Sequence, residues 1–266
     1  MYIIDMISLT LSCVLLSRVL MYIHLYPAEN NCIDSLRTSK IAGLTYSTFF
    51  RNIMPLARNW SVTLDHIRWE DRLDPMNHHP FFPHFATVLW DTTCFRVQKP
   101  SDWTFGRYVV NGHYDFPCFL VLTGITFTGH LVYASGLMRS TAYDASIFRD
   151  TRHEHPQFPW ELNIGDGHFS TCANFFTPTQ AIGGRQLATQ EVTWNEWLQL
   201  VRSRVEHLNT VVKNHRMFKG EPYRGWVRNL KVFVKISTHG AAAQLRASAA
   251  TRHDRYDGFG PWAHCP

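Results

Sequence analysis

The sequence predicts an α/β domain, and three features carry that prediction. Strand-like apolar runs recur between residues 85 and 165, and two of them are joined by Thr126–Gly129, a short connection typical of a hairpin. A segment with helical spacing at residues 140–150 is suited to cross over to a further strand, and a long amphipathic helix opens at Thr193. With 266 residues and 45% apolar content, the chain is long enough for one such domain and a small appendage.

Both ends of the chain are expected to lie outside the domain, which we place at residues 84–240. Residues 1–83 are expected to form a small helical region, and residues 241–266 a flexible tail. The apolar stretch Met6–Ser17 spans 17 − 6 + 1 = 12 residues, too few to cross a bilayer, and no basic residue precedes it as in a secretory signal. We expect a buried helix there and no membrane partner; a signal-anchor and a damaged start are the alternatives.

The N-terminal region also contains a second, weaker pattern. Residues 35–59 place Gly43 between two short helical patterns, as in a helix-turn-helix remnant. Arg51 would then face outward and contact DNA phosphates or base edges, whereas an ordinary helical hairpin is the alternative. Residues 58–83 turn polar and proline-rich, which is typical of a linker.

Four strands are expected, at residues 85–90, 118–125, 130–135 and 161–165. The second and third should be adjacent and antiparallel because the hairpin connection joins them. The first is expected to end at Asp91 and the last at Asp166. Acidic residues at the polar ends of neighbouring strands converge, because ligand sites of such sheets form just outside the strand ends.

The helix that opens at Thr193 carries a third acidic residue. Its apolar positions repeat every three to four residues, at Trp194, Trp197, Leu198, Val201, Val205, Leu208 and Val212. A polar stripe borders that apolar face and comprises Asn195, Arg202, Glu206, Asn209 and Lys213. Glu206 would therefore lie beside the core and still reach water, as a catalytic carboxylate on a helix must. A surface glutamate among basic neighbours is the alternative.

Basic residues gather on and after this helix. Residues 202–235 hold nine basic and two acidic residues, a local 9 − 2 = +7 that exceeds the net charge of +5 of the whole chain. We expect this stretch to follow the DNA backbone, with an affinity that falls steeply as salt rises. The residues expected to contact DNA here are Arg202, Asn209, Lys213 and Arg216. A solvated helix face is the alternative.

Together, Asp91, Asp166 and Glu206 would form a site for two divalent cations. Cleavage of a phosphodiester needs one cation to activate the attacking water or hydroxyl and one to stabilise the leaving oxygen. Carboxylate oxygens are the ligands that Mg²⁺ and Mn²⁺ prefer, and the cations offset the repulsion among the carboxylates. The six cysteines include no C-x-x-C pair, so they predict neither a zinc knuckle nor a disulfide framework.

Four blocks of sequence occur in a fixed order between residues 87 and 236. They are Asp91-Thr92-Thr93 with Pro100, Gly136 to Asp144, Gly165-Asp166-Gly167 with Thr177-Pro178, and Asn195 followed by Arg202-Ser-Arg-Val-Glu206. The acidic residues are 166 − 91 = 75 and 206 − 166 = 40 positions apart. In order and context these blocks resemble the DDE nuclease domain of the PIF/Harbinger transposases and their domesticated relatives.

That resemblance implies an RNase H-like fold, a mixed sheet flanked by helices, with Asp91, Asp166 and Glu206 as the catalytic and metal-binding residues. It implies that Asp144 caps a helix or contacts the metal ligands without binding the metal itself. It also implies cutting and joining of DNA with Mg²⁺ or Mn²⁺ and a nuclear site of action. A separate Myb-like DNA-binding partner and a homo-oligomer are compatible with it.

Two departures from the family pattern stand out. Tyr143 occupies the place of a histidine before Asp144, and the seven residues after Glu206 read His-Leu-Asn-Thr-Val-Val-Lys where the family favours Arg-x-Phe-Gly-x-Leu-Lys. All three metal ligands remain, so we expect nuclease competence rather than autonomous transposition. The alternative is a transposase-derived module that binds DNA or protein without catalysis.

Overall fold

The structure is a computed structural model, and it describes most of the chain from residue 68 onward. The described residues are 51, 55, 58–59, 68–78, 84–110, 114–181, 183, 185–214, 218, 222–223 and 227–253. The apolar stretch 6–17 and most of the predicted helix-turn-helix at 35–59 lie outside them. Arg51 is an exposed helical residue, and its contact with DNA stays a prediction.

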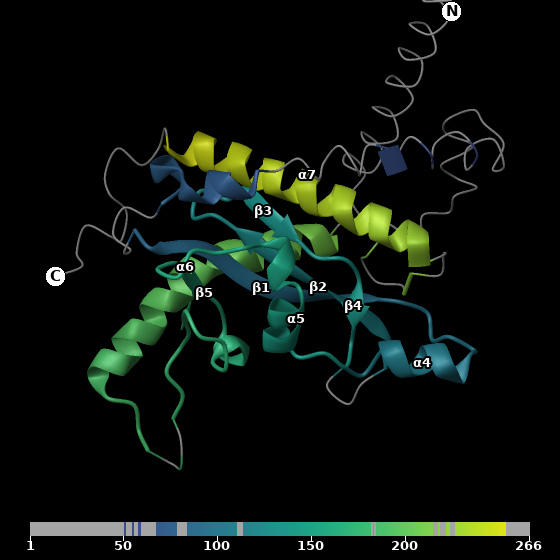
Figure 1. Cartoon of the computed structure of the whole chain (residues 1–266), viewed down its shortest axis with the longest axis horizontal. Helices are drawn as coiled ribbons and strands as arrows, with labels where there is room; N and C mark the ends of the chain where they lie inside the picture. The colour runs from purple at the N-terminus through teal and green to yellow at the C-terminus, as the bar shows by residue number, and fades with distance from the viewer. Residues whose placement is uncertain are drawn as a thin grey trace, which may run out of the picture.

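One mixed sheet of six strands forms the centre of the molecule, with the order β3-β2-β1-β5-β6 and with β4 paired to β2 (Figure 1). The strands are β1 Ala86–Arg96, β2 Cys118–Ile125, β3 Leu131–Ala134, β4 Met138–Arg139, β5 Leu162–Ile164 and β6 Phe175–Phe176. β1 pairs antiparallel with β2 and parallel with β5. The predicted hairpin is confirmed, since β2 pairs antiparallel with β3. A mixed sheet flanked by helices is the predicted RNase H-like α/β fold.

The helices are α4 Trp103–Val109, α5 Asp144–Asp150, α6 Thr189–Asn214 and α7 Val227–His253, and 3-10 helices lie at η2 Trp69–Leu73, η3 Pro75–Asn77, η4 Arg152–Glu154 and η5 Gly167–Phe169. The predicted amphipathic helix is confirmed as α6, which begins 193 − 189 = 4 residues earlier than expected. α5 begins later than the expected residue 140, because a turn follows β4, in which the backbone N–H of Ala142 donates to the Arg139 carbonyl at 3.1 Å.

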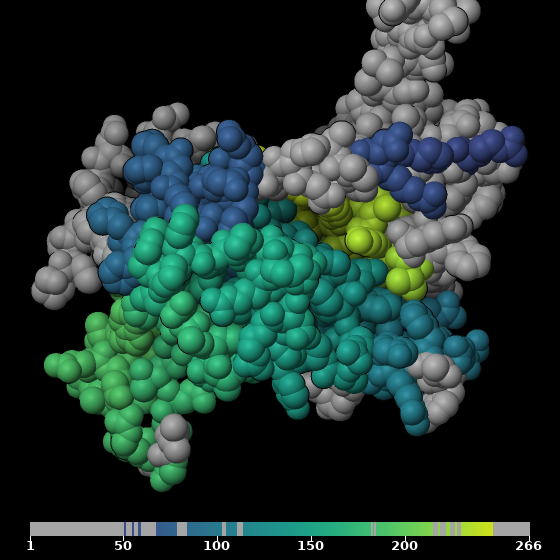
Figure 2. All heavy atoms as spheres, in the orientation of Figure 1, coloured from purple at the N-terminus to yellow at the C-terminus, as the bar shows by residue number. Residues whose placement is uncertain are grey.

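Side chains of β1 alternate between the two faces of the sheet, and each face has its own apolar core. Leu89 and Phe95 belong to the core that α6 and α7 cover. Trp90 belongs to the other core, where it meets Ile147 and Phe148 of α5. In Figure 2 the teal segments, which include α5, fill the middle of the view, and the yellow α7 is visible only in part.

β1 is longer than the predicted strand, so Asp91 lies in its middle and not at its end. The antiparallel pairing with β2 continues to the pair Arg96↔Cys118 and carries the strand five residues past Asp91, 96 − 91 = 5. Thr92 and Thr93 are β-branched and favour this extended backbone. The apolar run that ends at Trp90 therefore marks a change in polarity within the strand.

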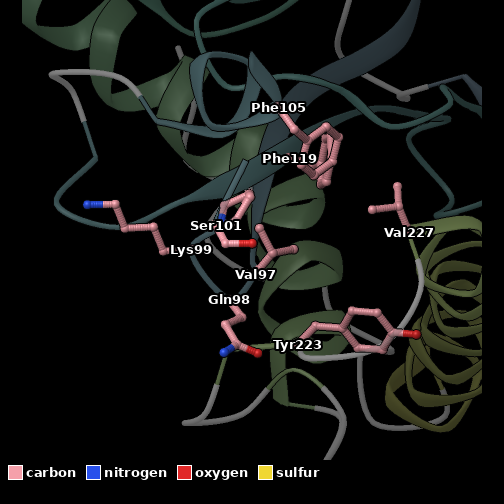
Figure 3. Close-up of a pocket in the computed structure, with 9 residues that line it drawn as sticks. Val97, Gln98, Lys99, Ser101, Phe105, Phe119, Tyr223 and Val227 are labelled. Carbon is pink, nitrogen blue, oxygen red and sulfur yellow. The ribbon is translucent and has the colours of Figure 1, made fainter. Parts of the chain in front are cut away.

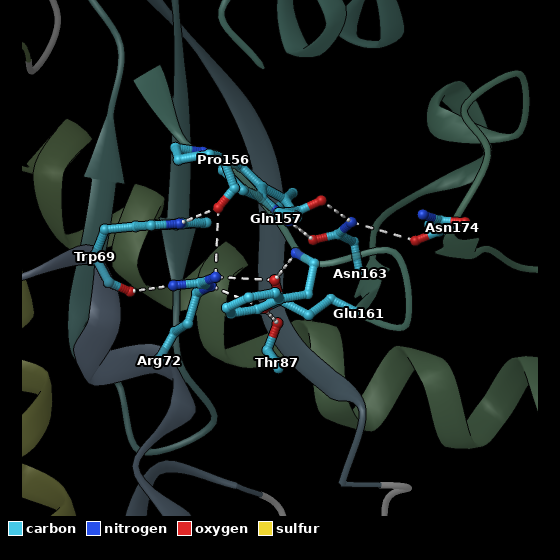
Figure 4. Close-up of polar contacts among 10 residues, drawn as sticks. Trp69, Arg72, Thr87, Pro156, Gln157, Glu161, Asn163 and Asn174 are labelled. Carbon is cyan, nitrogen blue, oxygen red and sulfur yellow. Dashed lines mark hydrogen bonds and ion pairs between the residues drawn. The ribbon is translucent and has the colours of Figure 1, made fainter. Parts of the chain in front are cut away.

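The segment before β1 packs on the domain, although residues 58–83 were predicted to be a linker (Figure 4). Arg72 pairs with Glu161 through two hydrogen bonds of 2.8 Å, and the two side chains are 2% and 0% exposed. Glu161 also accepts hydrogen bonds from the Thr87 hydroxyl at 3.2 Å and from the Phe158 backbone N–H at 2.6 Å. A buried carboxylate requires such partners, so the domain includes η2, which corrects its predicted start.

α7 corrects the flexible tail predicted for residues 241–266. The helix continues to His253, and Ala241 and Ala242 are buried in the core that α6 and α7 share with the sheet. Residues 254–266 lie outside the described residues. Among the helices that the structure describes, none has the length and apolar character needed to cross a membrane.

Candidate metal centre

Two of the predicted acidic residues meet where β5 leaves the sheet. The last pair of the parallel strands β1 and β5 is Leu89↔Ile164, so Asp91 and Asp166 both stand two residues further on, 91 − 89 = 2 and 166 − 164 = 2. β1 continues straight, whereas the chain after β5 turns away into η5. Both acidic residues are partly buried. The sheet register therefore places Asp91 and Asp166 just past the last pair of two neighbouring strands, near enough for the charge of Asp166 to act on Asp91.

The turn after β5 fixes the direction of Asp166. A Cβ atom at Gly165 would lie 2.5 Å from the ring of Phe169, which is fully buried, so this close approach requires glycine. Asp166 then caps η5, and its Oδ1 accepts a hydrogen bond from the backbone N–H of His168 at 2.9 Å. Its Oδ2 lies 3.9 Å from Nδ1 of the same histidine. One carboxylate oxygen of Asp166 thus stabilises the turn, and the other lies near the imidazole of His168.

Asp144 joins this place from the first residue of α5. Asp144, Asp166 and His168 each offer one ligand atom, and the three atoms lie within 4.8 Å of one another. His168 Nδ1 is 3.4 Å from Oδ2 of Asp144. The resemblance implied that Asp144 caps a helix or supports the ligands, whereas the structure places its carboxylate within the group itself. His168 was missed by the sequence analysis, and the signal for it was its place two residues after Asp166.

Burial and like charge raise the pKa values of these carboxyl groups. The pKa of Asp91 is raised to about 6, mainly by burial and in smaller part by the nearby Asp166 and Asp144. A hydrogen bond from Asn209 and the charge of Arg202 act in the opposite direction. Burial and Asp166 also raise the pKa of Asp144, and His168 partly offsets this. Burial and like charge both disfavour the charged form, so ionisation of these carboxyl groups is unfavourable without a cation.

Asn209 of α6 holds Asp91 from the other side. Its Nδ2 donates a hydrogen bond of 2.7 Å to Oδ2 of Asp91, and its Oδ1 accepts a hydrogen bond of 3.4 Å from the Thr123 hydroxyl. Asn209 was predicted to contact DNA, but it is 4% exposed on the side of α6 that faces β1 and β2, so little of it is open to a DNA backbone. It stands where the family pattern favours phenylalanine, and its amide orients Asp91 instead.

Glu206 lies on α6 but points its carboxylate at neighbours on the same helix. Its Oε1 is 3.2 Å from a guanidinium nitrogen of Arg202, and Nε2 of Gln199 donates to its Oε2 at 3.2 Å. In the described part of the chain, the ligand atoms that lie within 4.8 Å of one another belong to Asp144, Asp166 and His168, and this group includes neither Asp91 nor Glu206. Arg202 is 8% exposed, so its predicted contact with DNA is also unavailable, and its charge acts on Asp91 instead.

Two predicted DNA contacts remain, Lys213 and Arg216. Lys213 is exposed near the end of α6, as a contact with DNA requires, and Arg216 lies outside the described residues. The basic stretch therefore divides into a buried part that serves Asp91 and an exposed part that stays a candidate for DNA.

Two hollows open on the surface of the described residues. One, of about 1040 Å³, adjoins the acidic group and has Asp144 and His168 in its wall. The other, of about 330 Å³, lies at the far end of β1, between Val97, Phe119 and Tyr223 (Figure 3). Its described lining contains no acidic residue, histidine or cysteine and so offers no strong ligand for a cation. Of these two hollows, the first is therefore the one that adjoins candidate metal ligands.

The model of one protein family, described as DDE superfamily endonuclease, matches residues 90–238, which is more than half of the chain. The chain belongs to the DDE superfamily endonucleases. The match begins beside Asp91, includes Asp144, Asp166 and Glu206, and ends within α7. DDE endonucleases act on DNA and generally use divalent metal ions. No curated protein and no solved structure matches the chain.

The residues of this DDE endonuclease fit divalent cations. Asp144 and Asp166 offer hard oxygen ligands, His168 adds one imidazole nitrogen, and Asp91 is a further carboxylate near this group. Mg²⁺ and Mn²⁺ bind through such oxygen-rich sets, and the single nitrogen suits Mn²⁺ better than Mg²⁺. The raised pKa values of Asp91 and Asp144 also fit a cation site. A cation among these carboxylates would favour their charged forms.

Proposed function

We propose that this DDE endonuclease cleaves phosphodiester bonds of DNA with two divalent cations, Mg²⁺ or Mn²⁺, bound at Asp91, Asp166 and further carboxylates. The type of enzyme is the one that the resemblance to PIF/Harbinger transposases implies. The observation that carries the proposal is the parallel register of β1 and β5, which sets Asp91 beside Asp166 where β5 leaves the sheet. Asp144 from α5 adds a third carboxylate at the same place.

Bound divalent cations would supply an activated water or hydroxyl and a stabilised leaving oxygen. The task of the chain is to hold the ligand oxygens in place before the substrate arrives. The Asn209 amide fixes Asp91, and the backbone N–H of His168 fixes Asp166. Carboxylates fixed in this way need little rearrangement during the reaction, which is the general advantage of a preorganised site.

Glu206 stays in the proposal as the third catalytic carboxylate, and Asp144 is added to it. Glu206 precedes Asn209 by 209 − 206 = 3 residues and so shares its side of α6. At present it forms an ion pair with Arg202 and accepts a hydrogen bond from Gln199 near the surface. Two cations take more oxygen ligands than three side chains offer, so there is a role for both Asp144 and Glu206.

The test is metal-dependent nicking of supercoiled DNA by the purified full chain, in Mg²⁺ and in Mn²⁺. Asp91→Asn and Asp166→Asn are expected to lower the nicking rate by at least about a hundredfold, since loss of a ligand should exceed the effect of losing an outer partner. Asp144→Asn and Glu206→Gln, compared side by side, show which carboxylate completes the site. Asp150→Asn changes an exposed aspartate at the other end of α5 and is the matched control.

A second readout separates metal binding from catalysis. Mn²⁺ is expected to raise the melting temperature of the wild type and of Asp150→Asn, but not that of Asp166→Asn. Nicking that persists in Asp91→Asn and Asp166→Asn would exclude these residues as ligands. A folded wild type that binds Mn²⁺ and does not nick DNA would favour the binding module without catalysis.

On the resemblance alone, we further propose a nuclear site of action, a separate Myb-like DNA-binding partner and self-association. Imaging of a tagged full-length chain tests the first of these, and sedimentation of the purified chain tests the last. The wild type should concentrate in the nucleus, and a distribution that excludes the nucleus would contradict the first proposal.

A further inference from the structure

The hollow that adjoins the metal centre, called the groove from here on, has no part in the chemistry proposed so far. It has a volume of about 1040 Å³, and Asp144, Gly167 and His168 stand in its wall. It therefore opens directly onto the acidic group. A DNA strand with one phosphate at the metal centre has this groove as the neighbouring space for its next nucleotides.

The charge of the groove suits a phosphate backbone beyond the metal centre. Among its described lining residues, Asp144 is the one acidic residue, and Arg149 is an exposed cation on α5. Exposed hydroxyl groups of Thr141, Ser170 and Thr171 add hydrogen-bond donors. Arginine and hydroxyl side chains are common partners of DNA phosphate oxygens.

An aromatic side chain stands at the rim, next to the metal centre. Tyr143 is 82% exposed, more than any other large apolar side chain that the structure describes. It directly precedes Asp144, in the place where the related family block has a histidine. Single exposed aromatic residues are ordinary on protein surfaces, so exposure alone decides nothing. Its position in the groove lining, with Tyr114 also in that lining, gives the ring a function to serve.

We propose that this groove binds an unpaired stretch of the DNA strand next to the cleaved phosphate, with Tyr143 stacking on a base and Arg149 binding a phosphate. The inference rests on the nuclease function proposed above. The strand must be unpaired because paired bases stack on one another and offer no free face to an aromatic side chain. The proposal assigns strand binding to the start of α5, a part of the chain far from the basic stretch at residues 202–235.

The first experiment measures the affinity of the full chain for a labelled oligothymidine of about 12 nucleotides, a length within the range of single-strand sites. EDTA is present, so that no cleavage occurs, and fluorescence anisotropy reports binding. Tyr143→Ala is expected to weaken binding between about fivefold and a hundredfold, the range for loss of one stacked base. Tyr143→Trp should keep the affinity. Trp160→Ala removes an exposed aromatic residue outside the groove lining and is the matched control.

Salt dependence and crosslinking report on position. Arg149→Ala is expected to reduce the slope of log K against log salt by about 0.7, the value for one phosphate contact of a single strand. Lys99→Ala removes a cation from the other hollow and should leave the slope unchanged. An oligonucleotide that carries 5-iodouracil should crosslink on irradiation to the peptide that contains Tyr143.

The proposal is overturned by equal affinities of the wild type and Tyr143→Ala, or by equal losses in Tyr143→Ala and Trp160→Ala. A duplex of the same sequence that responds to Tyr143→Ala as strongly as the single strand would also contradict it. The nuclease proposal fails separately. A chain that does not nick DNA but crosslinks at Tyr143 loses the nuclease function and keeps the groove, whereas a chain that nicks DNA and is indifferent to Tyr143 loses only the groove.

Discussion

Two carboxylates stand at opposite ends of β5, and their surroundings differ in what stabilises the charge. Glu161 precedes the strand and is fully buried, but Arg72, the Thr87 hydroxyl and a backbone N–H all bind it. Asp166 follows the strand, is partly exposed, and has Asp91 and Asp144 nearby. The first carboxylate is stabilised within the chain, and the second lies among like charges. A three-residue strand thus separates a structural charge from one suited to bind a cation.

The largest expected effect comes from removing the cation that pairs with Glu161, at the start of β5. Arg72→Met leaves Glu161 buried without its cation and should lower the free energy of unfolding by about 3–5 kcal/mol. Urea unfolding at neutral pH measures this. The double variant Arg72→Met/Glu161→Gln should recover much of the loss, because no buried charge remains. Arg185→Met breaks the exposed pair with Glu191 and should change little; a comparable loss there would contradict the comparison.

His155 lies near the same end of β5 and makes stability depend on pH. It is 0% exposed among Trp69, Trp90, Tyr133 and Phe148, and burial lowers its pKa to about 4 from an ordinary 6.5. The unfolded chain therefore binds this proton at higher pH than the folded one. Stability from this group is complete above about pH 6.5 and is lost as the pH falls to about 4, a loss of about 3 kcal/mol.

The measurement is the slope of the unfolding free energy against pH, in the wild type and in His155→Phe. The phenylalanine variant keeps the aromatic packing and removes the titrating group, so its slope between pH 6.5 and 4 should be smaller. His153→Phe changes an exposed histidine two residues away and serves as the control. Identical slopes in the wild type and His155→Phe would show that the buried histidine is not the titrating group.

The other end of β5 should respond to metal and not to the loss of a partner within the chain. At a Mn²⁺ concentration of about 100 times the dissociation constant, binding should add about 2.7 kcal/mol to the stability of the wild type. Asp166→Asn should abolish this gain and, without metal, leave the fold intact, because it relieves like charge. A metal-free Asp166→Asn that unfolds like Arg72→Met would contradict the contrast between the two ends.

The smallest expected effect sharpens the role of Asn209. Asn209→Leu removes the hydrogen bond to Asp91 and should lower the unfolding free energy by about 1 kcal/mol at neutral pH. Metal affinity should fall about tenfold to a hundredfold, as is common when the outer partner of a ligand is lost. Asn195→Leu removes an amide of the same helix that binds the Thr179 backbone and should leave metal affinity unchanged.

Local periodicity was enough to predict the β2–β3 hairpin and the apolar face of α6, because neighbours in the sequence determine both features. Motif spacing and the resemblance predicted a shared site for Asp91 and Asp166, and the sheet register shows that the strands before them are parallel neighbours. Local pattern misplaced the end of β1, since pairing with β2 overrides the change in polarity at Asp91. The helical continuation of α7 was missed for a similar reason, because contacts with the core bury its small residues.

The contacts of the polar residues were the least predictable. Asn209 and Arg202 lie on a stripe that the helical period identified correctly, yet the period does not say that β1 lies against that stripe. His168 and Asp144 enter the centre from η5 and α5, segments whose approach is set only by the packed sheet. Arg72 looked like part of a polar linker because its partner Glu161 is 161 − 72 = 89 residues away.

The Arg72–Glu161 pair sets a limit on how this enzyme can be recombined. A fusion that replaces everything before Trp90, where the family match begins, would remove Arg72 and leave Glu161 buried without its cation. An exchange of targeting or DNA-reading modules that keeps this pair needs its junction upstream of Trp69. One buried guanidinium group thus limits where a fusion junction can be placed, in evolution or in the laboratory.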